Sequence, residues 1–319
     1  MSKFERKFYQ RAWRQFPVVQ ALLELWALPG VSSKKNGLRV AVRKNYLSFY
    51  RKGQSVAKLH STKQLLRLSV HAKYVDGVLK HDQAGMQEPG YVDFDESWLS
   101  EEKNAVRVHG WISSAASFAG AEKSYVDELI AANSGVIDIE MGLPAYEGEK
   151  NAPRMDLVLV EDHPTPLSLA FWEVKCADNS GARAKDEPKV VEQVRKYERW
   201  MEKPGRKEDV IAAYREAAAI LLDLADAAAR PLGHAQKSWR NLLDAPSAGV
   251  IGKPGVVIGG YCPSGYRETT EGNIERQAES FVNREHKDRL TDSFDLRVVY
   301  HPTPTEASNP LPSLRGTGH

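Results

Sequence analysis

The chain has 319 residues, enough for two domains, and its 42% hydrophobic content supports a folded core. Its only cysteines, Cys176 and Cys262, exclude a disulfide framework, a cysteine zinc site or a four-cysteine iron–sulfur cluster built from this chain alone. The formal net charge of +2 hides an asymmetry: residues 1–80 hold 17 Lys and Arg against 3 Asp and Glu, and the remainder holds 27 against 39. A basic first quarter favours a module that faces nucleic acid. The alternatives are a solvated basic surface, or an arm that docks on the acidic body of its own chain.

Residues 4–28 open the chain with apolar side chains at helical spacing, and Pro17 is expected to divide them into two helices. Three apolar runs with turn signals between them then predict a three-stranded meander. The runs are residues 38–43, 46–50 and 55–59. These elements predict a basic N-terminal domain over residues 1–85. The polar residues 86–117 are expected to form a connecting segment.

Basic side chains of this meander are interleaved with Tyr46, Phe49 and Tyr50, a combination that could face a phosphate backbone. The opposite interpretation is equally open, in which the aromatic residues are core and the charges are plain surface. The basic candidates for nucleic-acid contact are Arg39, Arg43, Arg51 and Lys58.

Residues 118–302 alternate between helical and strand patterns, which predicts a second domain and an α/β (α+β) class for the chain. The expected elements are helix 119–132, strand 136–141, two strands within 156–175, helix 188–202, a helical insertion at 205–245, strand 255–260, helix 273–290 and strand 294–300. Residues 303–319 are rich in Pro, Thr, Ser and Gly, so a disordered tail is expected there.

Two apolar strands of this domain carry charge at one end. Asp156 stands directly before the run 157–160, and a second run ends in Glu173 and Lys175. Side chains two apart on a strand share a face, so Glu173 and Lys175 project together. If the two strands pair, two carboxylates and one ammonium meet at a single point, which suits a divalent metal ion and the water that it activates. Burying these charges is costly unless they are paired or bind metal.

This Asp, Glu-x-Lys pattern resembles the PD-(D/E)XK nuclease superfamily, in which the motif sits on two adjacent strands of a small mixed sheet flanked by helices. Downstream, Gln193 and Tyr197 form a Gln-x-x-x-Tyr element that resembles the RecB-type and CRISPR-associated exonuclease branch. Upstream, Glu122 lies on a predicted first helix, as the family expects. The resemblance covers roughly residues 118–202, and Met155 stands where the family usually has Pro.

The resemblance implies a restriction-endonuclease-like core that holds Mg²⁺ or Mn²⁺. The implied metal-site residues are Asp156 and Glu173 as direct ligands, the carbonyl of Val174 as a third ligand, and Glu122, which would hold metal-bound water or a second metal. Lys175 would position or help to deprotonate the attacking water, and Gln193 and Tyr197 would orient the scissile phosphate or the DNA backbone. The alternative for Gln193 and Tyr197 is a pair that fastens the helix to the sheet. Basic residues that would contact phosphates beside the site are Arg183, Lys185, Lys189, Arg195 and Lys196.

Glu128 competes with Glu122 for the role of the helix carboxylate. Glu122 is preferred because apolar residues at +3, +4, +7 and +8 from it would form the buried stripe of the helix, as in the family. These residues are Tyr125, Val126, Leu129 and Ile130.

The sequence therefore predicts a metal-dependent nuclease that hydrolyses phosphodiester bonds, with DNA preferred to RNA. The Gln-x-x-x-Tyr element favours exonuclease or end-processing action, as in DNA repair, whereas the basic N-terminal domain would suit an endonuclease of restriction or phage-defence type. No helicase or ATPase motif is present, so a motor would be a partner protein. The alternatives are a nucleic-acid-binding or assembly protein without catalysis, and an unrelated α+β protein with a surface ion-pair cluster. Because neither a signal peptide nor a membrane-length apolar run is recognised, a cytoplasmic protein with no membrane partner is expected.

Overall fold

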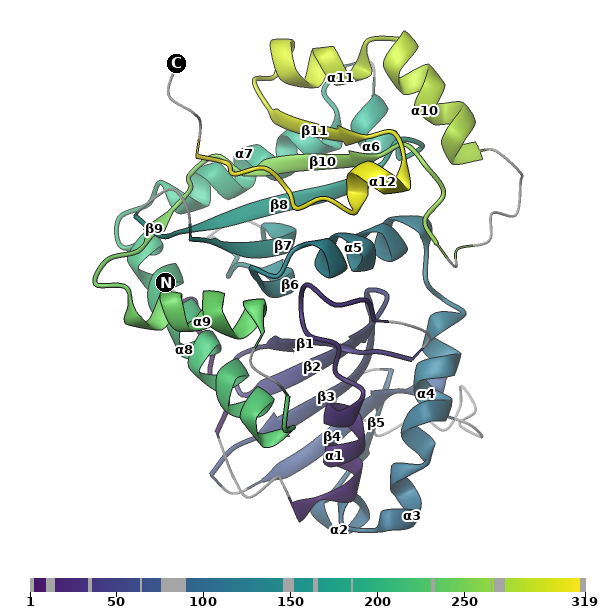
Figure 1. Cartoon of the computed structure of the whole chain (residues 1–319), viewed down its shortest axis with the longest axis vertical. Coiled ribbons are helices and arrows are strands. Elements are labelled where there is room, and N and C mark those ends of the chain that lie inside the picture. The colour runs from purple at the N-terminus through teal and green to yellow at the C-terminus, as the bar shows by residue number, and fades with distance from the viewer. Residues whose placement is uncertain are drawn as a thin grey trace.

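Two β-sheets organise the chain in the computed structural model, one formed by N-terminal and one by C-terminal residues (Figure 1). The structure describes residues 3–9, 15–33, 36–63, 65–75, 90–145, 152–162, 166–184, 186–230, 233–264, 266 and 273–315. Among these residues, no helix combines the length and the apolar character that a membrane span requires.

The N-terminal sheet is antiparallel throughout, with the strand order β1-β2-β3-β4-β5. Its strands are β1 (Arg39–Val42), β2 (Tyr46–Arg51), β3 (Gln54–Ser61), β4 (Leu66–His71) and β5 (Tyr91–Phe94), with a 3₁₀ turn at Ala72–Tyr74. The predicted meander is confirmed as β1–β3, and two further strands extend it. Because β5 lies within residues 86–117, the expectation of a plain connecting segment there is wrong. The helices that follow share the core of this sheet, and they are α2 (Glu96–Leu99), α3 (Glu102–Ala105) and α4 (Arg107–Ala116).

The first residues of the chain are extended, whereas the sequence predicted a helix. Lys7 pairs with Lys44 in an isolated parallel bridge, and the α-helix that the structure describes within residues 15–28 is α1 (Pro17–Glu24). Burial alternates strictly along residues 3–9, with Phe4 and Phe8 inside. A spacing of four residues fits both a helix turn and the two-residue period of a strand, so the apolar pattern alone could not separate the two.

The C-terminal sheet is mixed and has the strand order β11-β10-β8-β7-β6, with a short β9 beside β8. β7 is antiparallel to both of its neighbours, β6 and β8, whereas β8, β10 and β11 are parallel. The strands are β6 (Val136–Gly142), β7 (Arg154–Glu161), β8 (Ser168–Cys176), β9 (Gly249–Val250), β10 (Gly255–Gly259) and β11 (Arg297–His301). The predicted mixed α+β class is therefore confirmed.

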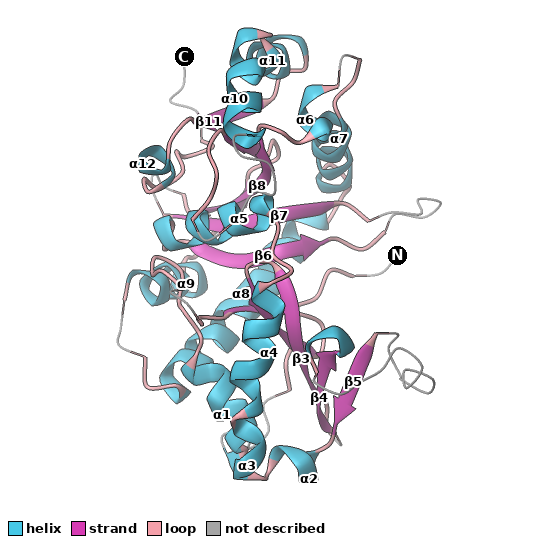
Figure 2. Cartoon of the chain, turned by 90° about the vertical axis from the view of Figure 1, so that its right-hand side faces the viewer, coloured by secondary structure: helices cyan, strands magenta, loops and turns pink. Residues whose placement is uncertain are grey.

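Helices cover both faces of this sheet (Figure 2). Consecutive side chains of β8 point to opposite faces. Trp172 packs in one cluster with residues of α5 (Ala121–Ala132), and Phe171 packs against Tyr197 of α7 (Lys189–Met201). The remaining helices are α6 (Ser180–Arg183), α8 (Arg206–Ala227), α9 (His234–Asp244), α10 (Asn273–Asn283), α11 (His286–Asp288) and α12 (Pro304–Ala307), with a π-helical turn at Arg289–Ser293.

One apolar cluster joins the two sheets. It contains Phe49 and Leu59 of the N-terminal sheet, Phe171 of β8, and Tyr214 and Leu221 of α8. The helices α8 and α9 fall within the predicted insertion at residues 205–245, and α8 packs between the sheets. The two sheets thus share a core rather than forming separate ones.

The segment after β11 is packed, so the expectation of a disordered tail is wrong for residues 303–315. Leu311 and Leu314 are buried beside α5 and the sheet. The backbone N–H of Leu311 donates to Asn133 Oδ1 at 2.7 Å, and that of Leu314 donates to Glu161 Oε1 at 2.9 Å. The composition is rich in Pro and Ser, yet the segment forms the short helix α12 and is held against the sheet by two buried leucines.

Candidate functional site

The two strands predicted to carry the motif are neighbours, and their charged ends meet. β7 and β8 are antiparallel with Leu157 opposite Trp172, so one residue further along Asp156 lies opposite Glu173. At this point the backbone N–H of Val174 donates to a side chain instead of to a backbone carbonyl of the neighbouring strand: its acceptor is Asp156 Oδ2, at 2.8 Å. This hydrogen bond fixes the carboxylate at the end of the strand pair.

Lys175 and Glu122 complete the predicted set. Lys175 Nζ donates to Glu173 Oε1 at 2.5 Å and to the carbonyl of Val174 at 3.1 Å, and it lies 3.8 Å from Glu122 Oε1. Asn179, just beyond β8, donates from Nδ2 to Glu122 Oε2 at 2.6 Å. The first turn of α5 is thereby tied to the end of β8.

The structure separates the two candidate carboxylates of α5. Glu128 accepts hydrogen bonds from Tyr261 Oη at 2.7 Å and from the backbone N–H of Ser264 at 2.6 Å. It lies six residues beyond Glu122, about 9 Å along the helix. Glu122 is therefore the one that belongs to the group at the strand ends. The buried stripe that favoured it is present, and it consists of Tyr125, Val126, Leu129 and Ile130.

Sequence reasoning missed two members of the group, Lys123 and Glu140. Lys123 Nζ donates to Asp156 Oδ1 at 3.0 Å and to Glu140 Oε1 at 2.5 Å. The only sequence signal for Glu140 was an acidic residue inside an apolar strand, and nothing near Lys123 in the sequence identifies its partners. We call the six residues the carboxylate–lysine cluster. Its members are Glu122, Lys123, Glu140, Asp156, Glu173 and Lys175.

The surroundings shift the pKa values of the two central carboxyl groups in opposite directions. Burial raises the pKa of Glu173, and the nearby charge of Asp156 adds to this, so that its pKa reaches about 8 despite Lys175. Burial also acts to raise the pKa of Asp156, but Lys123, Lys175 and the Val174 N–H outweigh it and hold the pKa below its usual value. One carboxyl group is thus kept ionised and its neighbour is poised to take up a proton.

The donor set fits a divalent cation. The cluster holds four carboxyl groups and two ammonium groups, which leaves a formal charge of −2 when all are ionised. Carboxylate and carbonyl oxygens are the ligands that Mg²⁺ and Mn²⁺ take in proteins. Over the described residues, no three acidic, His or Cys side chains converge on one point as a ready metal cage. The oxygens of Asp156 and Glu173 instead converge on the ammonium groups of Lys123 and Lys175.

Tyr197 does not reach the cluster, and its expected contact with a phosphate is corrected. Its ring is fully buried against Phe171, with centroids 4.9 Å apart, and its hydroxyl donates to the carbonyl of Ile251 at 3.3 Å. A buried hydroxyl with a backbone partner fastens α7 to the sheet, which is the alternative that the sequence left open.

Gln193 is half-buried one turn before Tyr197 on the same face of α7. The start of α7 packs near the end of β8, because Val190 and Val194 share a cluster with Ala177, so the helix runs antiparallel to the strand. Because Gln193 precedes Tyr197 by one turn, it lies nearer than Tyr197 to the end of β8 that carries Glu173. Gln193 remains a candidate for contact with substrate.

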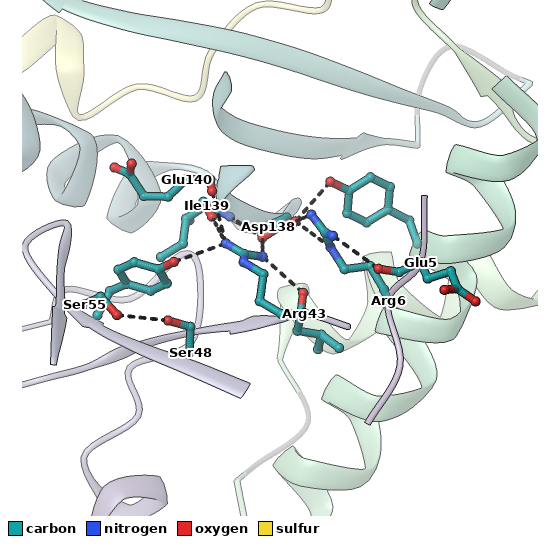
Figure 3. Close-up of polar contacts among 11 residues, drawn as sticks. Glu5, Arg6, Arg43, Ser48, Ser55, Asp138, Ile139 and Glu140 are labelled. Atoms are coloured by element: carbon teal, nitrogen blue, oxygen red, sulfur yellow. Dashed lines mark hydrogen bonds and ion pairs between the residues drawn. The ribbon is translucent and has the colours of Figure 1, made fainter. Parts of the chain in front are cut away.

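Three of the four basic candidates of the N-terminal sheet are buried, so the prediction that they contact nucleic acid is wrong. Arg39 pairs with Asp127 at 2.8 Å, and Arg51 donates to Ser33 Oγ at 3.1 Å. Arg43 pairs with Asp138 at 2.6 Å (Figure 3). Arg39 and Arg43 dock the basic N-terminal segment on acidic residues of the same chain, which is one of the alternatives above.

Lys58 alone of that set keeps partial exposure, and its Nζ lies 4.0 Å from the centroid of the Tyr91 ring. Beside α7, Lys189 is exposed at the first helical residue, and half-buried Arg183 donates to Ser280 Oγ at 3.4 Å. Arg195 pairs with Glu187, and Lys196 pairs with Glu192 at 2.7 Å. Lys185 lies outside the described residues.

Comparison with known proteins provides no relative: no family model matches the chain, and neither the curated proteins nor the solved structures give a match. The chemistry of the carboxylate–lysine cluster therefore has to be argued from its own geometry.

Proposed function

We propose that this protein is a Mg²⁺- or Mn²⁺-dependent nuclease with a PD-(D/E)XK type of site. The observation that carries the proposal is the meeting of Asp156 and Glu173 where the ladder between β7 and β8 ends, with Lys175 and Glu122 in contact beside them. The element order also supports it, because a helix, an antiparallel three-stranded unit, a second covering helix and a parallel strand come in the chain order α5, β6, β7, β8, α7 and β10, with α6 before α7 and with α8, α9 and β9 before β10. A restriction-endonuclease-like core is the fold that we propose for this half of the chain.

Each residue of the cluster would have a distinct role at such a site. Asp156, Glu173 and the carbonyl of Val174 would hold the cation, and Glu122 would hold a water bound to it. A divalent cation in this place supplies a water of lowered pKa and stabilises charge on the departing oxygen.

Lys175 is fully charged in the metal-free chain. Burial lowers its pKa, but the negative charges of Glu173, Asp156 and Glu122 outweigh this and raise it. In this state the ammonium offsets phosphate charge and holds the water in place. We expect a nearby divalent cation to lower the pKa of Lys175, because the two positive charges repel each other.

DNA is the proposed substrate, with RNA as the second choice, and an exonuclease or end-processing action is favoured over internal cutting. Since Arg39, Arg43 and Arg51 are buried, the proposed phosphate contacts are reduced to Lys58, Arg183 and Lys189, with Gln193 near the reacting phosphate. A helicase or ATPase would have to be a separate protein.

The second candidate is a nucleic-acid-binding or assembly protein without catalysis. One observation favours it: Lys123 and Lys175 each pair with a central carboxylate, so the cluster is partly compensated without any metal.

Cleavage of labelled linear and circular DNA, single- and double-stranded, with Mg²⁺, Mn²⁺ or EDTA, separates the two candidates. We expect cleavage with either metal and none with EDTA, and Asp156→Asn should lower the rate by at least about 100-fold, near 2.7 kcal/mol in the barrier. Glu128→Gln is the matched control, since it removes a carboxylate of α5 outside the cluster and should keep the rate within a few-fold. Binding of DNA by wild type without cleavage in any metal would favour the second candidate.

A further inference from the structure

Lys123 has a fixed place between two carboxylates of the cluster. Its ammonium donates to Asp156 Oδ1 at 3.0 Å and to Glu140 Oε1 at 2.5 Å. The Lys123 ammonium therefore lies at Asp156 Oδ1, whereas Oδ2 of the same carboxylate accepts the backbone N–H of Val174.

The backbone is bent to aim Glu140 at this ammonium. Glu140 has a φ of +51°, in the left-handed region that non-glycine residues seldom adopt and that costs of order 1 kcal/mol or more. Arg43 holds the bend, because its Nη2 donates to the carbonyl of Ile139 at 2.5 Å and to that of Glu140 at 3.2 Å. Figure 3 shows these two bonds, with the Glu140 carboxylate turned away from Asp138.

The stem of Lys123 is confined by the turn between β2 and β3. Gly53 has a φ of +69°, and a Cβ atom added to it would lie 2.6 Å from Lys123 Cδ. Lys52, beside it, donates from Nζ to the carbonyl of Ser264 at 3.1 Å and so ties the turn to the C-terminal half. The methylene groups of Lys123 therefore lie directly against backbone of the N-terminal sheet.

We propose that Lys123 is a built-in cation: its ammonium fills the position between Asp156 and Glu140 that a second divalent ion would otherwise take. The protein accordingly binds one divalent ion per chain, on the side where Asp156 faces Glu173. In two-metal sites a carboxylate commonly serves both ions and the second ion supplies positive charge to the reacting phosphate. Lys123 supplies that charge here without a metal. The inference deepens the proposed function and rests on it, since it concerns the same cluster.

Calorimetric titration of Mn²⁺ into the full chain measures the number of ions bound and tests the inference without an activity assay. Wild type should bind one ion, and Lys123→Gln should bind two, because Asp156 and Glu140 then face each other without a positive charge. Two ions on wild type, or an unchanged number and affinity in Lys123→Gln, would overturn the inference.

Two further variants serve as matched controls. Lys123→Arg keeps the charge and should stay at one ion, whereas Lys123→Gln combined with Glu140→Gln loses a ligand of the vacated position and should return to one. If Lys123→Gln does not fold in EDTA because its carboxylates repel each other, Mn²⁺ should restore its circular dichroism spectrum. Failure of Mn²⁺ to restore the spectrum would count against the inference.

The outcomes distinguish this inference from the proposed function. One ion on wild type and two on Lys123→Gln would support both the built-in cation and the metal site of the proposed nuclease. One ion on both, with equal affinity, would refute the built-in cation and leave the nuclease standing. No ion on either protein would refute both.

Discussion

At the scale of single residues, the environment sets apart groups that look equivalent in the sequence. Asp156 and Glu173 lie opposite each other, yet the pKa of the first is held down by Lys123 and Lys175 and that of the second is raised to about 8 by burial and by Asp156. Tyr197 and Gln193 share a helix face, yet the tyrosine is fully buried and the glutamine is half-exposed. These two differences lead to predictions for single substitutions.

The raised pKa of Glu173 predicts a pH dependence of stability in the metal-free protein. Its pKa is about 8 in the folded chain against an ordinary value of 4.5, so its contribution to stability is complete below the lower value and is lost as pH rises to the higher one. Wild type in EDTA should therefore lose free energy of unfolding over this range, and Glu173→Gln should lose less. Urea unfolding at several pH values checks this, and parallel curves for the two proteins would contradict it.

Substitutions of Tyr197 and Gln193 should have different effects: the first should lower stability and the second should lower activity. Tyr197→Phe leaves the carbonyl of Ile251 without its partner and should destabilise the protein by about 1 kcal/mol, with cleavage per folded molecule unchanged. Gln193→Ala should do the opposite, lowering the cleavage rate with little change in stability. Urea unfolding and a cleavage assay on the same preparations test both, and a large loss of activity in Tyr197→Phe would restore its phosphate-binding role.

At the scale of elements, close contacts between helices and strand ends position the cluster. α5 reaches the cluster because Tyr125 packs against Gly259 at the end of β10 and its hydroxyl lies 2.8 Å from His301 Nδ1. A Cβ atom at Gly259 would lie 2.9 Å from the Tyr125 ring, whereas one at Gly142, at the end of β6, would meet nothing within 4 Å.

Gly259→Ala should therefore destabilise the protein by about 1–3 kcal/mol, because a rigid buried ring has to move. Gly142→Ala is the matched control and should change the free energy of unfolding by less than about 0.5 kcal/mol. Thermal or urea unfolding measures both, and equal effects of the two substitutions would mean that α5 does not depend on this contact.

The sequence predicted correctly those elements whose apolar pattern fits only one type of secondary structure. The motif strands, α7 and β10 are continuous apolar or amphipathic segments with clear turn signals, and each was expected within a few residues of its place. For residues 4–8 the prediction of a helix is wrong, because an apolar spacing of four residues suits a strand as well as a helix. The partners of Lys123 could not be predicted, since Glu140 and Asp156 come to it only through tertiary packing and a left-handed bend.

At the scale of the whole molecule, a buried polar network joins the two sheets. Asp138 of β6 accepts hydrogen bonds from Arg6 Nη2 at 2.9 Å, Arg43 Nη1 at 2.6 Å and Tyr214 Oη at 3.0 Å (Figure 3). These donors come from the first strand-like segment, from the residue after β1 and from α8. Burial acts to raise the pKa of Asp138, but the two arginines outweigh it and lower the pKa. Arg6 and Arg43 thus stabilise the junction between the sheets and are not available to a partner.

Removing Asp138 should cost far more than removing a surface ion pair. Asp138→Ala leaves two buried guanidinium groups without their carboxylate and should destabilise the protein by about 3–5 kcal/mol. Glu192→Gln, which breaks the exposed pair with Lys196, should cost at most about 0.5 kcal/mol. Urea unfolding of both variants tests this, and a small effect of Asp138→Ala would show that the junction does not depend on the network.

The most direct test of the central claim, that Asp156 and Glu173 hold a divalent cation, is the change in melting temperature that Mn²⁺ causes. An ion at a hundredfold excess over its Kd stabilises the folded state by about 2.7 kcal/mol, so the melting temperature of wild type should rise by several degrees. Asp156→Ala should abolish the rise. No rise in wild type, or an equal rise in Asp156→Ala, would contradict the claim and leave the cluster as an ion-pair network.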